Sequence, residues 1–348
     1  MAPVVNARIR YPIPGETTVC DATHSIDLEI QELHGGFLVK TLVLSIDPGM
    51  RTRMRNPEEK GYAPAFVLGE PIDGLGVGIV LRSENPDVRV GQYIQGRGFL
   101  HQEYFVLPTL PMGMAFLEKH PKLPLTVYVG ALGMAGKTAW AGWKEYSNAK
   151  KGETVFVSAG AGPVGSMVIQ LAKLDGCKVI ASAGSADKVA FLRDIGADVA
   201  FNYKTSDTRE VLGREGPVDI YWDNVGGDTL DAALDYAAIN ARFFECGLIS
   251  NLNAGAAQSL VIKDPLLVFS KSISLQGIAS FRIIPKHEAA FYASIPEKHQ
   301  WLLPYCNTVD HYRIPYCNKG VPWPPSQDRP LLHYGNAMHY VRHQKRDS

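Results

Sequence analysis

Apolar and polar residues follow two different patterns, which meet near residue 127. Before that point, short apolar runs are separated by clusters of Gly, Pro, Asn and Asp, which is typical of strands joined by turns. The strands predicted in this part are 38–46, 74–81, 90–94 and 103–107. The pattern predicts a β-barrel-like first domain without β–α–β units.

From residue 154 onward, strand-like apolar runs alternate with amphipathic helical segments. The predicted strands are 154–157, 178–182, 198–201, 218–222, 241–246 and 273–278, and helices are predicted from residue 164 and over 187–195. This alternation predicts an α/β domain with a parallel sheet covered by helices on both faces. We expect its ligand at the carboxyl ends of the strands.

A glycine-spaced turn joins the first of these strands to the first helix. The spacing is Gly160-x-Gly162-x-x-Gly165, with Pro163 and Val164 at the start of the helix. Glycines in such a turn let the backbone approach a pyrophosphate, and the helix N-terminus offers free N–H groups and the positive end of its dipole. The segment therefore predicts a dinucleotide-binding site.

The end of the second strand indicates which dinucleotide is bound. NAD-binding members of this fold carry an acidic residue there, about 20 residues after the first glycine, to bind the ribose hydroxyls. This chain has no carboxylate at that strand end; Gly184 leaves room, Ser185 offers a hydroxyl and Lys188 can reach a 2′-phosphate. NADPH is therefore the predicted cofactor, although Lys188 is also compatible with an ordinary exposed charge in a first helical turn.

Composition narrows the partners and the compartment. Lys plus Arg and Asp plus Glu each number 35, so the overall charge gives no attraction to nucleic acid or acidic membranes, and a small-molecule partner is expected. We find neither a signal-peptide pattern nor an apolar run long enough to span a membrane, which predicts a cytoplasmic protein. The five cysteines are an odd number and widely spread, as expected for reduced thiols.

Several segments in order along the chain then carry a family resemblance. They are Leu44-Ser45-Ile46-Asp47-Pro48, Met50-Arg51-x-Arg53-Met54, Leu68-Gly69-Glu70-Pro71, Leu132-Gly133-Met134-Ala135-Gly136, Asp223-Asn224-Val225-Gly226-Gly227 and Cys246-Gly247-Leu248-Ile249-Ser250. Together they resemble zinc-independent medium-chain reductases of the leukotriene B4 12-hydroxydehydrogenase type, which include prostaglandin and plant alkenal double-bond reductases.

The resemblance implies an architecture and a set of cofactor residues. It implies a GroES-like catalytic domain (1–126), a Rossmann NADP-binding domain (127–285), a C-terminal segment (286–348) that returns to the catalytic domain, and commonly a homodimer. Besides the turn and Lys188, the residues it assigns to NADPH are Met134, Tyr203, Asn224, Cys246 and Ser250. An ordinary half-buried aromatic remains the alternative for Tyr203, and close helix packing remains the alternative for the segment 133–136.

The sequence also predicts how the chemistry proceeds. Zinc-dependent alcohol dehydrogenases of the same superfamily carry Cys and His ligands in the first domain, where this chain has only Cys20, so no metal is expected. Without a metal, NADPH suits hydride delivery to the β-carbon of an α,β-unsaturated aldehyde or ketone, and the resemblance points to the same reaction. A quinone reductase of the zeta-crystallin type and an NADPH-binding protein with weak activity are the alternatives.

Two positions depart from the family pattern within the expected pocket. The family usually has tyrosines where this chain has Gly49 and Leu252. Leucine cannot donate the hydrogen bond that would stabilise an enolate oxygen. Tyr62, in a loop that the family places near the pocket, is the predicted catalytic replacement, and a tyrosine that only covers a loop is the alternative.

The last fifty residues depart as well. They hold five of the ten histidines and six prolines but no glutamate, and neither helical nor strand periodicity persists. We expect the part after residue 298 to be irregular or disordered. An alternative reading frame, a mis-joined coding sequence or retained non-coding sequence is our hypothesis for its origin, which sequencing of the transcript across codons 290 to 310 tests.

Overall fold

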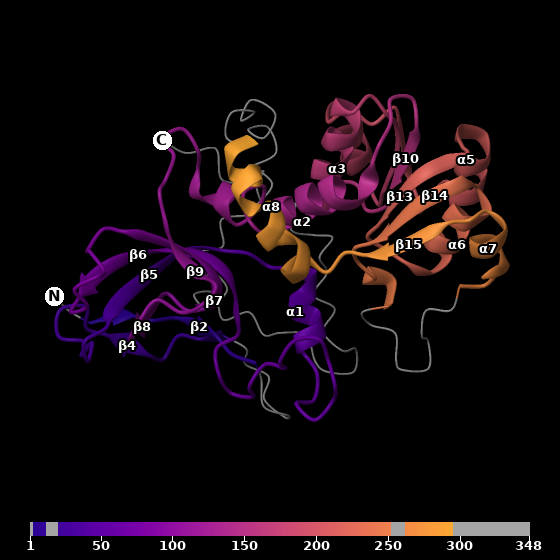
Figure 1. Cartoon of the computed structure of the whole chain (residues 1–348). Helices are drawn as coiled ribbons and strands as arrows, with labels where there is room; N and C mark the ends of the chain where they lie inside the picture. Colours follow the sequence, from indigo (N-terminus) through magenta and orange to yellow (C-terminus); the bar gives the residue numbers. More distant parts are fainter. Residues whose placement is uncertain (1–2, 12–19, 252–261, 295–348) are drawn as a thin grey trace. The chain divides into compact units, whose positions relative to one another are not determined.

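The computed structural model describes residues 3–11, 20–251 and 262–294 (Figure 1). It divides the chain after Gly130 into two units, each of which has its own apolar core. The boundary predicted after residue 126 lies slightly earlier. The predicted irregular tail and Leu252 lie outside the described residues.

The first unit is built on a five-stranded antiparallel sheet with the strand order β8-β5-β6-β7-β9. Its strands are β5 (Phe37–Leu44), β6 (Asp73–Ser83), β7 (Tyr93–Leu100), β8 (Tyr104–Leu107) and β9 (Met114–Leu117). Short strands form two additional pairs, β1 (Val4–Val5) with β4 (Ser25–Ile26) and β2 (Arg8–Ile9) with β3 (Cys20–Asp21). One helical turn, α1 (Pro48–Arg53), follows β5, and the 3₁₀ helix η1 (Leu125–Tyr128) closes the unit.

The strand predicted at 90–94 is wrong for most of its length, because β7 runs from Tyr93 to Leu100. Residues 90–92 belong to a turn in which Gly91 has a φ of +85°. Within β7, Gly96 and Gly98 have φ angles of +143° and +91°, and glycine is disfavoured in strands. Because of these glycines the sequence pattern does not predict the strand, which is stabilised by pairing with both neighbours, β6 and β9.

The second unit contains a six-stranded parallel sheet with the strand order β12-β11-β10-β13-β14-β15. Its strands are β10 (Thr154–Val157), β11 (Lys178–Ala183), β12 (Val199–Asn202), β13 (Val218–Asp223), β14 (Ala237–Glu245) and β15 (Ser274–Gly277). This order is that of a doubly wound Rossmann sheet, with the chain reversing its direction of winding between β10 and β13. The predicted α/β fold class is confirmed.

Helices cover both faces of this sheet, with α3 on one side and α5 and α6 on the other in Figure 1. The helices are α2 (Met134–Gly142), α3 (Pro163–Leu174), α4 (Ala186–Asp194), α5 (Thr208–Glu215), α6 (Gly227–Asp235), α7 (Leu266–Ser270) and α8 (Ser280–Ser294). A π-helical turn, η2 (Trp143–Ser147), extends α2, and a 3₁₀ turn, η3 (Ile249–Asn251), follows β14. Among the described helices, none has the length and apolarity needed to cross a lipid bilayer.

The predicted strand 241–246 begins four residues late, since β14 starts at Ala237. The pairing of β13 with β14 shifts register here, from Val218 opposite Ala237 to Ile220 opposite Arg242. In the irregular stretch Ile239 is 75% exposed, so the apolar pattern is interrupted although the chain still pairs.

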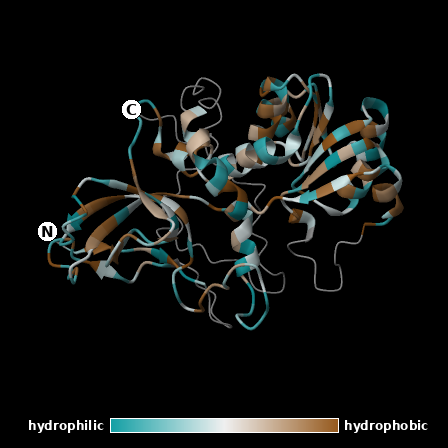
Figure 2. Cartoon of the chain, viewed as in Figure 1, coloured by the Kyte–Doolittle hydropathy of each residue, from teal (hydrophilic) through white to brown (hydrophobic). Residues whose placement is uncertain are grey.

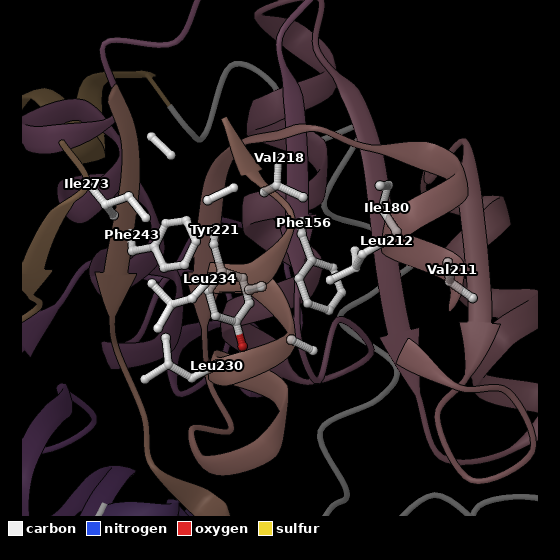
Figure 3. Packing of buried hydrophobic residues seen from close by; sticks show 14 of the residues in the cluster. Phe156, Ile180, Val211, Leu212, Val218, Tyr221, Leu230, Leu234, Phe243 and Ile273 are labelled. Carbon is white, nitrogen blue, oxygen red and sulfur yellow. The ribbon is translucent and has the colours of Figure 1, made fainter. Parts of the chain in front are cut away.

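Aromatic packing forms the centre of the second core. The Phe156 ring stacks on the Tyr221 ring with centroids 4.9 Å apart, and Phe243 meets Tyr221 edge-on at 5.2 Å (Figure 3). All three residues are fully buried. In the central strands β10 and β11, residues 155–157 and 179–181 are apolar and fully buried, as expected where both faces of a parallel sheet are covered. Elsewhere in the sheet, hydrophobic stretches alternate with hydrophilic ones (Figure 2).

Candidate cofactor-binding site

The site develops where β10 and β13 lie side by side and their following segments diverge. β10 ends at Val157 and continues into the glycine turn, whereas β13 ends at Asp223 and continues into the segment Asn224–Gly227. Both segments leave the sheet at its carboxyl edge. In a doubly wound sheet this is the position at which a ligand binds.

Two of the three turn glycines are required by packing. A Cβ at Gly165 would lie 2.8 Å from both the Ala159 carbonyl oxygen and the Gly160 Cα, so helix α3 can approach the turn only without a side chain there. A Cβ at Gly160 would lie 2.9 Å from Leu192 and 3.0 Å from Ile169. The turn thus packs closely between α3, which follows β10, and α4, which follows β11.

Gly162 is less confined than the other two glycines. A Cβ there would meet only the Ala159 carbonyl oxygen, at 3.3 Å. Gly162 is the N-cap of α3 and supplies no side-chain cap, and Pro163 has no N–H group. The N–H groups of Val164 and Gly165 therefore have no partner within the helix, so this end can receive an anionic pyrophosphate.

Residues of three elements meet at the end of β11. A Cβ at Gly184 would lie 3.0 Å from the Tyr203 hydroxyl and 3.3 Å from Lys204 Cε, so the absence of a side chain at Gly184 lets both residues approach. Ser185 is the N-cap of α4 but makes no side-chain cap, and Lys188 lies in the first turn of the same helix. Among the described residues Lys188 forms no ion pair, so a cation, a hydroxyl and a phenol are available for a phosphate.

Lys204 was missed by the sequence interpretation, which took only Tyr203 from the segment Phe201-Asn202-Tyr203-Lys204. Its stem reaches Gly184 because Asn202 ends β12 and turns the chain, with the Asn202 Oδ1 accepting a hydrogen bond of 3.0 Å from the Lys204 N–H. A second basic residue beside a predicted phosphate site was the available signal.

Asn224 is held against the strand that leads to the glycine turn. Its backbone N–H donates to Ser158 Oγ at 2.9 Å, and its Nδ2 donates to the Ser158 carbonyl oxygen at 2.7 Å. These two hydrogen bonds fix the side-chain orientation of Asn224 in its half-buried position. The same side chain cannot also donate this Nδ2 hydrogen elsewhere, so its remaining donor and its carbonyl oxygen are the groups left for a ligand.

The buried carboxylate of Asp223 holds the segment Asn224–Gly227 in place by accepting hydrogen bonds from it. Its Oδ1 accepts hydrogen bonds from Tyr221 Oη at 2.7 Å, Ser158 Oγ at 3.1 Å, the Val225 N–H at 2.7 Å and the Gly226 N–H at 2.8 Å. Asp223 is completely buried. The sequence interpretation included Asp223 in a family segment but gave it no role.

The segment after β14 is tied to the segment after β13. Ser250 Oγ donates to the Val225 carbonyl oxygen at 2.6 Å, and a Cβ at Gly227 would lie 3.2 Å from that hydroxyl oxygen. The N–H of Cys246 donates to the Asp223 carbonyl oxygen at 2.9 Å. Burial raises the pKa of the Cys246 thiol to about 12, so this thiol is not a nucleophile at neutral pH.

Met134 begins helix α2, which packs against α3 and α8. A Cβ at Gly136 would clash severely with the Ala131 carbonyl oxygen. Close packing at the helix start, the alternative reading of this segment, therefore explains Gly136. The role of Met134 itself stays a prediction.

In the first unit, Arg53 of the family segment and the adjacent Arg55 shape the loop that carries Tyr62. Arg53 makes a two-point ion pair with Asp73, at 2.7 and 2.9 Å, and its guanidinium lies 4.1 Å from the centre of the Phe66 ring. Arg55 donates to the Thr52 carbonyl oxygen at 2.7 Å and to the Glu59 carbonyl oxygen at 3.0 Å. Both arginines thus hold the backbone of this loop.

Tyr62 lies beside Gly49, one of the two positions where the family usually has a tyrosine. A Cβ at Gly49 would be 3.1 Å from the Tyr62 hydroxyl, so this phenol stands in the space beside Gly49. Tyr62 is 75% exposed. The neighbouring residues 64–68, with Arg55 and Pro57, line a cavity of about 570 Å³.

Within the described part of the chain, no group of three or more His, Cys, Asp or Glu residues is arranged to hold a metal ion. The expectation that the reaction needs no metal rests on the sequence and stays a prediction.

Comparisons with known proteins agree with this architecture. Residues 25–110 match a family model described as the N-terminal domain of oxidoreductase, and residues 163–294 match one described as zinc-binding dehydrogenase. The chain is 37% identical over 306 residues to 2-alkenal reductase (NADP(+)-dependent) of Nicotiana tabacum, which covers 86% of this chain and 87% of that protein. It is 38% identical over 272 residues to (+)-pulegone reductase of Mentha piperita, covering 76% and 78%.

A solved structure is similar as well. CurA of Vibrio vulnificus, crystallised in complex with NADPH, has 31% identity and a TM-score of 0.72, covering 89% of this chain and 90% of that one. The chain belongs to the medium-chain dehydrogenases/reductases, in the group of leukotriene B4 12-hydroxydehydrogenases and alkenal double-bond reductases. The predicted family is confirmed, as are the predicted enzyme class, an NADP-dependent oxidoreductase, and the predicted cofactor, NADPH.

The two kinds of turn glycine are expected to respond differently to alanine. Gly162→Ala should cost less than about 1 kcal/mol of stability, because its Cβ meets a single backbone oxygen at 3.3 Å, but should weaken NADPH binding at least about tenfold. Gly165→Ala should lower the free energy of unfolding by about 1–3 kcal/mol, because its Cβ meets backbone. Denaturant unfolding and NADPH titration check both variants. Wild-type affinity in Gly162→Ala would contradict the approach of the pyrophosphate to this turn.

Proposed function

We propose that this protein is an NADPH-dependent reductase of the carbon–carbon double bond in α,β-unsaturated aldehydes and ketones. The observation that carries the proposal is the identity of 37%, over most of both chains, with an NADP(+)-dependent 2-alkenal reductase. The described site agrees with it, because the phosphate-binding groups around Gly184 and the uncapped start of α3 suit NADPH. A cytoplasmic location and a homodimer stay predictions.

The residues of the second unit fit the cofactor in a consistent direction. We assign the pyrophosphate to the turn Gly160–Gly165 and the 2′-phosphate to Ser185, Lys188, Tyr203 and Lys204. Asn224, Cys246 and Ser250 are assigned to the nicotinamide half. Support for the last assignment is that the segments 223–227 and 246–250 are hydrogen-bonded to each other beside the strand that carries the turn.

When bound, NADPH supplies the hydride that adds to the β-carbon of the acceptor. Negative charge then develops on the carbonyl oxygen, and a proton from solvent completes the reduction at the α-carbon. The protein needs a donor at that oxygen and an apolar surface for the acceptor. We assign the donor to Tyr62, whose hydroxyl stands beside Gly49, and the apolar surface to the cavity lined by Pro64, Phe66 and Leu68.

The activity is tested by following NADPH oxidation at about 340 nm with a 2-alkenal, a cyclic enone and a quinone in parallel, a choice that follows from hydride transfer to an electrophilic carbon. We expect turnover with the alkenal and the enone, and product analysis should show a saturated carbonyl compound. Turnover with the quinone alone would support the quinone reductase instead. NADPH binding without turnover of any acceptor would support the weakly active NADPH-binding protein.

Lys188→Ala should reduce NADPH affinity by about 10- to 100-fold, because a charge-assisted hydrogen bond to the 2′-phosphate is lost. NADH affinity should not change, since NADH lacks this phosphate. Lys151→Ala, which removes an exposed lysine between η2 and β10, is the matched control and should change neither affinity. An equal loss for NADPH and NADH would contradict the assignment of Lys188.

Tyr62→Phe should lower kcat with an alkenal by about 100- to 1000-fold, the effect expected for loss of one donor to a developing oxyanion. NADPH affinity should be unchanged. Tyr93→Phe, at the half-buried start of β7 in the same unit, is the control and should retain activity. Full activity of Tyr62→Phe would show that the tyrosine only covers its loop.

A further inference from the structure

Two carboxyl groups lie side by side beneath the proposed nicotinamide half of the site. Asp223 ends β13, Glu245 ends β14, and the parallel strands place the two residues directly opposite each other. Asp223 Oδ2 and Glu245 Oε1 are both buried, and among the described residues neither atom has a hydrogen-bond donor. Two ionised carboxylates in this arrangement would repel each other without compensation.

A single shared proton resolves this arrangement. Asp223 is the better carboxylate, since four donors already bind its Oδ1. Glu245 has no comparable donors, so it carries the proton and donates a hydrogen bond to Asp223 Oδ2. Burial first, and then the charge and hydrogen bond of Asp223, raise the pKa of Glu245 to about 8.

Within the described ranges, no positive charge acts on Glu245 in place of the proton. Besides Asp223, the ionisable groups that face Glu245 are Tyr221 on β13 and Cys246 beyond β14, and the pKa of each is raised, by burial first and then by these carboxyl groups. From β15, the residue opposite Glu245 is Gly277, which has no side chain. Just beyond β10, the neutral Ser158 hydroxyl donates to Asp223 Oδ1. Loss of the proton therefore leaves two facing negative charges.

Loss of this proton would first affect the segment whose N–H groups bind Asp223. The Val225 and Gly226 N–H groups and the Ser158 hydroxyl share Asp223 Oδ1, and Asn224 is held through Ser158. We propose that Glu245, neutral and hydrogen-bonded to Asp223, is a positioning residue that keeps the segment Asn224–Gly227 in its NADPH-binding form. The inference rests on the proposed assignment of Asn224 to the cofactor.

The direction of the pH effect follows from linkage. The unfolded chain ionises Glu245 near its ordinary pKa, whereas the folded protein holds the proton until its higher pKa. The stability contributed by the protonated group is thus complete below about pH 4.5, falls as pH rises, and is lost above about pH 8. NADPH affinity should fall as pH rises through about 8, because binding favours the protonated form.

The test is the pH dependence of the NADPH dissociation constant in three proteins: wild type, Glu245→Gln and Glu210→Gln. The glutamine amide donates to Asp223 Oδ2 but does not titrate in this range. Glu210, exposed in the first turn of α5, controls for the loss of one titratable carboxyl group in the same unit. A thermal melt of each variant at neutral pH checks folding.

We expect the wild-type dissociation constant to rise by up to about tenfold per pH unit above about pH 8. Glu210→Gln should follow wild type, whereas Glu245→Gln should bind NADPH with near wild-type affinity at about pH 7 and show no such rise. A wild-type affinity that is constant up to about pH 9.5, or the same pH dependence in Glu245→Gln, overturns the inference.

Since the wild-type profile is informative alone, the inference can be overturned even if Glu245→Gln fails to fold. The measurement is also independent of turnover. Reduction of no acceptor would refute the proposed function and leave the pH profile to decide the role of Glu245. Enone reduction together with an NADPH affinity that is constant with pH would support the proposed function and refute the role of Glu245.

Discussion

One carboxylate oxygen, Oδ1 of Asp223, connects the two halves of the proposed cofactor site. Through Ser158 it reaches the end of β10, through Tyr221 it is joined to the aromatic core, and through two backbone N–H groups it fixes the turn before α6. Adjacent parallel strands are held by the sheet only up to their ends. Beyond those ends, at the point where the winding reverses, this oxygen sets the spacing between the glycine turn and the segment Asn224–Gly227.

Close backbone packing acts together with this hydrogen-bonded centre. Gly165 lets α3 approach the turn, and Gly184 lets Tyr203 and Lys204 approach the end of β11. At both positions the missing side chain leaves space for neighbouring groups to approach, and the proposed pyrophosphate and 2′-phosphate sites depend on that approach. A cofactor with two phosphate-bearing regions can then be bound mainly by backbone N–H groups, one helix N-terminus and a few exposed side chains.

The sequence was most informative where local pattern and function coincide. β10, the glycine turn and α3 were predictable because an apolar run, the glycine spacing and an amphipathic period occur together. β7 was not, since Gly96 and Gly98 conceal a strand that exists only through pairing with its neighbours. The pairing of Asp223 with Glu245, 22 positions apart, and the stem of Lys204 beside Gly184 depend on strand register and on a turn. Hydrophobic periodicity along the sequence does not predict either of these contacts.

The different demands of the two units also explain why departures at Gly49 and Leu252 are compatible with the family fold. A hydride donor that is bound and oriented carries the difficult chemical step, so the acceptor site needs chiefly a hydrogen-bond donor and an apolar surface. A donor can be supplied from more than one loop position, and the Tyr62 hydroxyl, which lies beside Gly49, is the donor proposed above. The cofactor site has no such freedom, because a Cβ at Gly165 or an unpartnered charge at Asp223 would displace the backbone itself. Amino-acid substitutions should therefore be tolerated better around the acceptor than at the carboxyl end of the Rossmann sheet, where they would move the backbone.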